Sequence, residues 1–163
     1  MPSRLKSNPN KGLPVIIFLP STWFKYFHLA HHRFTQIPGK DPELAFEKPK
    51  TVLGYIIHVS GFSTWIGHFK TLFKNAINNC DADFLPKKAE ARIVKESRLL
   101  LFGYGMILSV NIFWMSAELF WIWLLPVLLG QPFLRFYLLA EHGLCPTVAN
   151  MFENTRTIFT NRI

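Results

Sequence analysis

The alternation of apolar and polar positions divides the chain into short segments. Residues 1–12 are polar, basic and interrupted by Pro2 and Pro9, which predicts a disordered basic N-terminus. The apolar run that follows, residues 13–19, is much shorter than the roughly 20 residues that a membrane-spanning helix needs. Residues 21–36 contain a predicted helix that Ser21 or Thr22 can cap, that starts near Trp23, and that the Pro-Gly pair at 38–39 ends.

A longer apolar segment, residues 51–69, carries no formal charge, although lysines and arginines flank it on both sides. Its length permits a membrane span. A single crossing, however, would leave one basic cluster on the non-cytoplasmic face, against the preference of Lys and Arg for the cytoplasm. The flanking charges therefore predict a segment that dips into or lies on the membrane and returns to the same side.

Residues 99–134 form the longest apolar run, and Glu118 is its only formal charge. A single helix of that length would reach about 54 Å, whereas the hydrocarbon core of a bilayer is about 30 Å thick. The run therefore predicts a transmembrane hairpin of two spans that turns near residues 116–118 and emerges at Arg98 and Arg135. Residues 135–163 become a cytosolic tail segment. The predicted fold class is an all-α, integral membrane protein with interfacial and cytosolic helices.

Composition supports a membrane rather than nucleic acid as the partner. The formal net charge of +8 would by itself fit nucleic-acid binding. However, no Lys or Arg lies between Arg98 and Arg135, so the charge is distributed about a membrane. Residues are 50% hydrophobic and only 17% charged, more apolar surface than one small soluble core can hide. Cys80 and Cys145 are far apart, which fits a reducing compartment and gives no zinc-site signal.

The candidate chemistry lies in the predicted helix 21–36. His28, His31 and His32 would fall within an arc of about 100° on one helix face, and imidazole nitrogens suit iron, zinc or copper better than magnesium or calcium. The alternative is an interfacial helix whose histidines are ordinary polar residues. His142 follows the predicted second span and emerges on the same side, which makes it a fourth candidate ligand, although a lone histidine is more often an ordinary polar residue. His58 is interpreted as structural, as is His68.

Two parts of the sequence resemble the membrane fatty acid desaturases. The string FHLAHHRFTQIPGKDPEL is similar to the second histidine box of that family and the connector after it, and AEHG with ENTRT resembles the segment before the third box. The resemblance implies a mostly helical membrane protein with two irons bound at the cytoplasmic side. Such an enzyme uses O2 and two electrons from a ferredoxin or b-type cytochrome to remove two hydrogens from an acyl lipid or acyl thioester.

The same resemblance implies that His28, His31, His32 and His142 are iron ligands. The family also has a first histidine box upstream and a third downstream, but no histidine precedes His28 or follows His142 in this sequence. Two irons held by imidazoles need about eight ligands, so four supply about half. We therefore expect a partial desaturase domain over residues 13–163 that is catalytically inactive alone, as a fragment, a misannotated reading frame or a decayed gene product.

Two further functions remain open at this point. A related di-iron membrane hydroxylase or ketolase, acting on a carotenoid, sterol or alkane, would use the same ligands, because the geometry of the bound substrate selects the product. The other is a non-catalytic membrane protein whose histidines are remnants or serve another metal.

Overall fold

The computed structural model describes residues 18–45, 49–142, 145–146, 148, 150 and 153, so the predicted disordered N-terminus lies outside the described residues. The helices follow one another as α2 (Ser21–Phe34), the 3-10 helix η1 (Pro42–Ala45), α3 (Val52–Ser60), α4 (Phe62–Ala76), α5 (Lys87–Phe113), the π-helical turn η2 (Phe120–Leu124) and α6 (Leu125–His142). No strand occurs among the described residues, so the all-helical character predicted from the sequence is confirmed.

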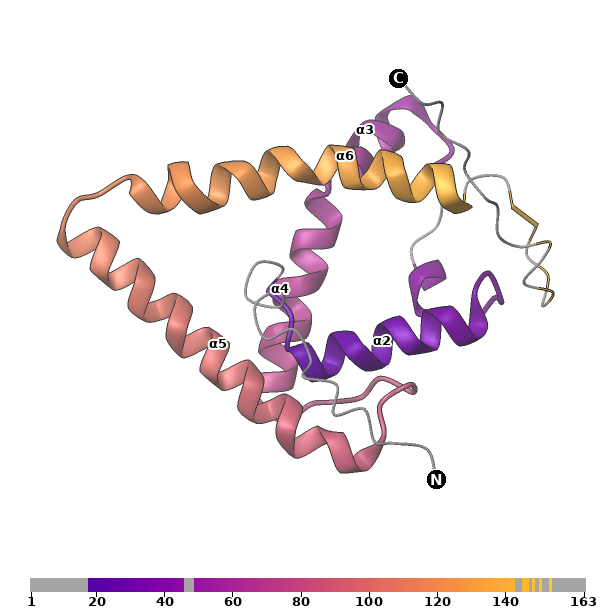
Figure 1. The fold of residues 1–163 in the computed structure, drawn as a ribbon, viewed down its shortest axis with the longest axis horizontal. Helices are drawn as coiled ribbons and strands as arrows, with labels where there is room; N and C mark the ends of the chain where they lie inside the picture. Colours follow the sequence, from indigo (N-terminus) through magenta and orange to yellow (C-terminus); the bar gives the residue numbers. More distant parts are fainter. Residues whose placement is uncertain are drawn as a thin grey trace, which may run out of the picture.

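Helices α5 and α6 meet at a turn and spread apart from it, and α4 runs between them as the third side of a triangle (Figure 1). The turn occupies residues 114–117, where Met115 takes a left-handed conformation with φ 47°. It overlaps the predicted turn at residues 116–118. Helix α4 packs on α5, α3 packs on α6, and α2 packs on α5. The two arms that the sequence predicts as a hairpin are therefore separated by α4.

Among the described helices, one stretch, Phe120–Leu139, is long and apolar enough to cross a membrane. Only 6% of it is buried, so its apolar side chains face outward. Helix α5 does not qualify because its first part is basic. Its uncharged part, residues 99–113, rises only about 22 Å, less than the roughly 30 Å of a hydrocarbon core. The sequence predicted two spans, and the described residues contain one candidate.

The segment predicted to lie on the membrane, residues 51–69, folds as two helices joined at Gly61. Thr51 Oγ1 accepts a hydrogen bond from Gly54 N at 3.0 Å and so caps α3. Gly61 has φ 72° and serves both as the C-cap of α3 and as the residue before α4. A Cβ at this position would lie 3.0 Å from Cβ of Gln131 on α6. Glycine therefore permits both the left-handed turn and the close approach of α6.

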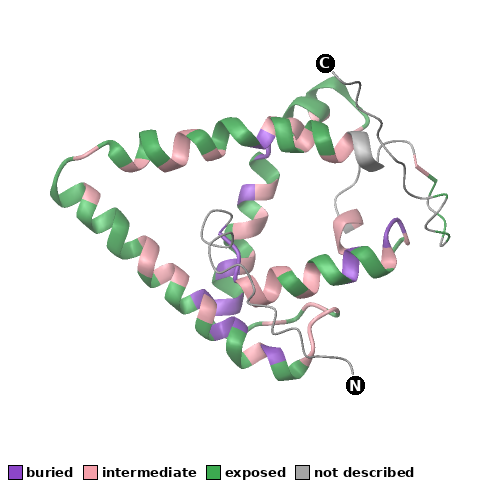
Figure 2. Cartoon of the chain, viewed as in Figure 1, coloured by how far each residue is buried: buried purple, intermediate pink, exposed green. Residues whose placement is uncertain are grey.

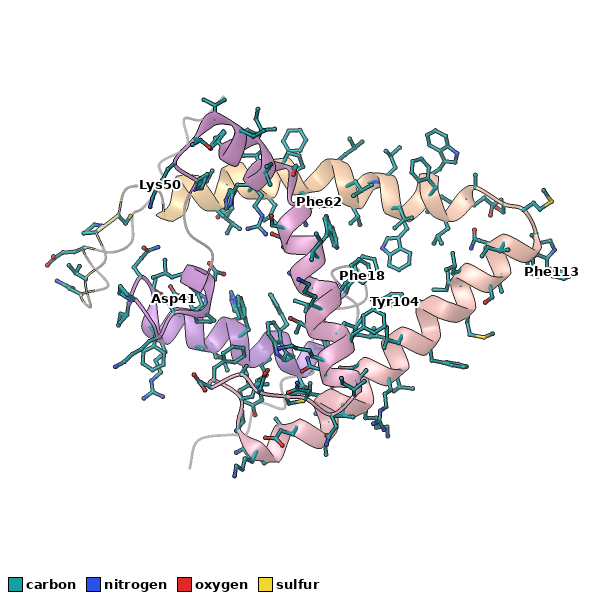
Figure 3. The ribbon with its side chains drawn as sticks, turned by 180° about the vertical axis from the view of Figure 1, so that it is seen from behind. Phe18, Asp41, Lys50, Phe62, Tyr104 and Phe113 are labelled. Carbon is teal, nitrogen blue, oxygen red and sulfur yellow. The ribbon has the colours of Figure 1, made fainter. Side chains whose placement is uncertain are left out.

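The buried core lies where α2, α4 and α5 meet (Figure 2). Leu72 of α4 and Ile93 of α5 are fully buried there. Phe18, just before α2, is also buried and inserts between the arms of the triangle (Figure 3). Its ring contacts four aromatic rings, at centroid distances of 5.3, 4.7, 4.9 and 5.5 Å from Trp65, Phe69, Tyr104 and Trp123. These rings belong to α4, α5 and η2, so Phe18 connects the start of α2 to all three.

Away from that junction, the distal half of α5 and most of α6 have exposed apolar side chains (Figure 2). Phe113 is 81% exposed, Ile122 76% and Phe133 75%. Such large contiguous apolar surface on a monomer indicates contact with lipid or with another protein. Together with Phe120–Leu139, it supports association with a membrane.

Candidate metal centre

The N-terminus of α2, the helix that carries the three histidines, is held by Glu96 of α5. Glu96 Oε2 accepts hydrogen bonds from Thr22 N at 2.8 Å and Ser21 Oγ at 3.0 Å. Glu96 Oε1 accepts from Thr22 Oγ1 at 2.7 Å and from Arg92 Nε at 2.8 Å. The sequence-based assignment of Ser21 or Thr22 as N-cap is therefore wrong. Pro20 occupies the cap position without a side-chain cap bond, and a carboxylate from another helix satisfies the first turn.

The electrostatics of Glu96 match this role. Burial raises the pKa of its carboxyl, but the hydrogen bonds from Thr22, Arg92 and Ser21 outweigh burial, so the pKa lies below its ordinary value. The ionised form is thus the one that α2 binds. A carboxylate at a helix N-terminus is also favoured by the helix dipole.

Two of the predicted ligands, His28 and His32, converge on the exposed face of α2. Their Nε2 atoms lie 3.0 Å apart and their rings pack edge to face, with centroids 4.4 Å apart. Two nitrogens bound to one metal at about 2.1 Å and at right angles would also be separated by about 3.0 Å. The pair is therefore close enough to serve as two cis ligands of one metal ion, as the i, i+4 spacing in the sequence suggests, and the same distance also fits a hydrogen bond between the two rings.

The pKa of His28 lies below its ordinary value. Burial contributes most, the neighbouring imidazoles of His32 and His31 add to it, and Glu43 acts in the opposite direction. A lowered pKa favours the neutral imidazole, which is the form that binds a metal.

His31 has a different environment from its two neighbours. It is only 5% exposed, and its Nδ1 lies 3.0 Å from Asp41 Oδ1 and 3.6 Å from Glu43 Oε2. Its ring centroid is 5.6 Å from that of His32. The sequence treats the three histidines as equivalent members of one face, whereas the structure pairs His28 with His32 and joins His31 to a carboxylate. Within the described residues, no group of three or more His, Cys, Asp or Glu side chains is arranged to hold a metal.

The fourth predicted ligand, His142, is the last residue of α6, and its side chain lies outside the described residues. The C-terminal ends of α2 and α6 lie on the same side of the structure in both views of the ribbon (Figures 1 and 3). The charges of Glu43 on η1 and Arg135 on α6 also interact.

The two histidines interpreted as structural lie on other helices. His58 is on α3 and His68 is on α4, where its ring is 5.9 Å from that of Trp65.

The sequence interpretation missed three carboxylates near the histidine helix: Asp41, Glu43 and Glu96. The first two belong to the polar connector after the Pro-Gly turn, which sequence reasoning treated only as a link. An aspartate placed directly after such a turn could have signalled a chain that folds back on the helix. Glu96 gave no local signal, because its partners are distant in the sequence.

The model of the family described as Fatty acid desaturase matches residues 7–163. The chain belongs to the fatty acid desaturase family. Members of this family are membrane-associated and generally use two irons and O2, acting on acyl lipids with external electron donors. No curated protein and no solved structure gives a significant match to the chain. The converging nitrogens of His28 and His32 fit a metal of the kind that the family uses.

Proposed function

We propose that this desaturase-family chain contributes about half of a di-iron site, with His28, His31, His32 and His142 as ligands. The observation that carries the proposal is the 3.0 Å separation of the Nε2 atoms of His28 and His32. The lowered pKa of His28 supports it, since metal binding needs a neutral ring. The C-terminal ends of α2 and α6 lie on the same side of the structure (Figures 1 and 3), which supports the inclusion of His142.

The membrane arrangement that we propose follows from where α2 is bound. Glu96 joins α2 to the part of α5 that contains Lys87, Lys88, Arg92, Lys95 and Arg98. The preference of Lys and Arg for the cytoplasm assigns this basic part, and the histidines with it, to the cytoplasmic side. The apolar stretch Phe120–Leu139 would then cross the membrane, and the uncharged part of α5, which is shorter than a span, would enter it from the cytoplasmic side.

In this arrangement, the residues of the chain bind the metal, orient its ligands and the substrate chain, and exclude water from the site. The exposed apolar faces of α5 and α6 border the acyl chains of lipid and bring a substrate chain towards the cytoplasmic ends of the helices. The imidazoles hold the metal, and Asp41 fixes the ring of His31. Bound iron with O2 would supply the oxidising chemistry that removes two hydrogens from an acyl chain, with electrons from a ferredoxin or b-type cytochrome. A hydroxylase or ketolase would need the same residues, because the position of the substrate selects the product.

Four histidines are about half of the ligands that two irons need. We therefore propose that a polypeptide of this sequence alone binds less than two irons and turns over no substrate. The test is to purify the chain in detergent and measure bound iron, and then to assay acyl lipid products with an electron donor and O2. Two tightly bound irons per chain, or unsaturated product, would overturn this part of the proposal.

The assignment of ligands is tested separately, with Co²⁺ alone as the probe. His28→Ala and His32→Ala should each weaken Co²⁺ binding at least tenfold, because each removes one of two converging nitrogens. His58→Ala removes an imidazole outside the proposed site and serves as the matched control. Equal Co²⁺ affinity in all three variants and the original chain would overturn the assignment.

A further inference from the structure

Asp41 lies beside the C-terminal end of α2 (Figure 3), and its fully buried side chain contacts the middle histidine of the motif, His31. Its carboxylate accepts hydrogen bonds from Gln36 N at 2.8 Å and Glu43 N at 2.9 Å. The third contact is with His31 Nδ1, at 3.0 Å. A buried carboxylate with three partners is fixed in position, because moving it would leave backbone donors unsatisfied.

The contact favours one of the two ring nitrogens of His31 as the site of its proton. An ionised carboxylate only accepts hydrogen bonds, so Nδ1 of His31 must be the donor. In a neutral imidazole, a proton on Nδ1 places the lone pair on Nε2. A metal binds the nitrogen that carries the lone pair, and a carboxylate on the opposite nitrogen both orients the ring and makes it a stronger ligand.

We propose that Asp41 is a positioning residue that keeps His31 in the Nδ1–H tautomer and so prepares its Nε2 for the metal. The inference rests on the proposed function for the identity of the site, but the tautomer can be measured without any metal. Asp41 also links this preparation to the chain after the helix, because the same two oxygens close the turn from Gln36 to Glu43.

Glu43 is the alternative carboxylate for this role. Its Oε2 is 3.6 Å from His31 Nδ1, too long for a good hydrogen bond, and its side chain is 33% exposed. The side chain of Asp41 is 0% exposed and closer. Glu43→Gln is therefore the matched control, since it removes a charge from the same connector without removing the short contact.

The first experiment measures the ring ¹⁵N shifts of His31 in the metal-free chain, in detergent micelles. The original chain should show the proton on Nδ1. Asp41→Asn should lose that preference because the neutral amide no longer favours a donor at Nδ1, whereas Glu43→Gln should keep it. A proton on Nε2 in the original chain would overturn the proposal, whether or not any variant folds.

The second experiment measures Co²⁺ affinity. Asp41→Asn should weaken binding about 10- to 100-fold, the usual effect of removing a partner of a metal-bound histidine. Asp41→Glu, which keeps the carboxylate, should restore much of the affinity, and Glu43→Gln should stay within about threefold of the original chain. Unchanged affinity in Asp41→Asn would overturn the positioning role.

The two proposals fail in different ways. If the proposed function is wrong, Co²⁺ binding will not depend on His28 or His32. If the role of Asp41 is wrong, Co²⁺ binding will depend on those histidines but will not change when Asp41 is replaced. Thermal unfolding of each variant is measured in parallel. If Asp41→Asn does not fold, the Co²⁺ affinity of Asp41→Glu is compared with that of the original chain instead.

Discussion

Replacing Glu96 by Gln should loosen the histidine helix at its N-terminus. Glutamine has the same length but only one accepting oxygen, so its NH2 group would face donors that the carboxylate now binds. The hydrogen bond to Thr22 N satisfies an otherwise unpaired helix amide, and removing such a cap costs about 1 kcal/mol. Loss of the charge also weakens the bonds from the two hydroxyl groups by a similar total, because hydrogen bonds to a charged group are stronger than neutral ones, although the amide oxygen of Gln can still accept one of them.

The bond from Arg92 contributes little, because that side chain is 65% exposed and the pair is screened by solvent. The total for Glu96→Gln is therefore about 2 kcal/mol. Expressed as a local opening equilibrium, this is about a 30-fold change, since 1.4 kcal/mol corresponds to a factor of ten.

Hydrogen exchange of the backbone amides in the first two turns of α2 measures this opening directly. The purified chain in detergent is compared with Glu96→Gln and with Glu90→Gln, which removes the same charge from the first turn of the same helix. Exchange in α2 should accelerate about 30-fold in the first variant and stay nearly unchanged in the second. Equal exchange in both variants would show that Glu96 does not hold the helix.

Three further outcomes are expected from the same structure. The pKa of Glu96 lies below its ordinary value of 4.5, so its contribution to the stability of α2 should be complete above pH 4.5 and be lost as the pH falls through the lowered pKa. Protection of the α2 amides from exchange should therefore fall at acidic pH in the original chain but not in Glu96→Gln. Phe18→Ala should destabilise the chain by about 3 kcal/mol in thermal unfolding followed by circular dichroism, since it empties a buried site between aromatic rings, and an unchanged midpoint would contradict the packing described. Gly61→Ala should destabilise the chain more than Gly39→Ala in the same assay. Both glycines have positive φ, but only at Gly61 would a Cβ meet another helix, at 3.0 Å from Gln131. Equal losses of stability in the two variants would mean that α6 does not pack against Gly61.

The sequence predicted what depends on local spacing. The i, i+4 separation of His28 and His32 brings their nitrogens together in any helix, and the structure has that helix. The same spacing could not distinguish His31, because its environment is set by a connector that folds back after the Pro-Gly turn. Asp41 belongs to that connector, and its hydrogen bonds allow this polar residue to be buried.

Non-local contacts also explain the differences in helix boundaries. No rule about the residues before α2 could have identified Glu96 as its cap, since that contact forms only when α5 packs on α2. The composition of α5 changes from basic to apolar along its length, but the backbone continues as one helix through this change. Residues on both sides are good helix formers, so one helix runs through, and its apolar part alone is too short for a span.

Phe18 lies just before α2 and Glu96 binds its first turn, so the start of the helix is attached to two elements of the triangle. The ring of Phe18 contacts Trp65 on α4, while the carboxylate of Glu96 comes from α5. The imidazole pair is one to three helical turns further along the same helix. Because both attachments act at the start of α2, the position of the imidazole pair is set by α4 and α5 together and not by the sequence of α2 alone.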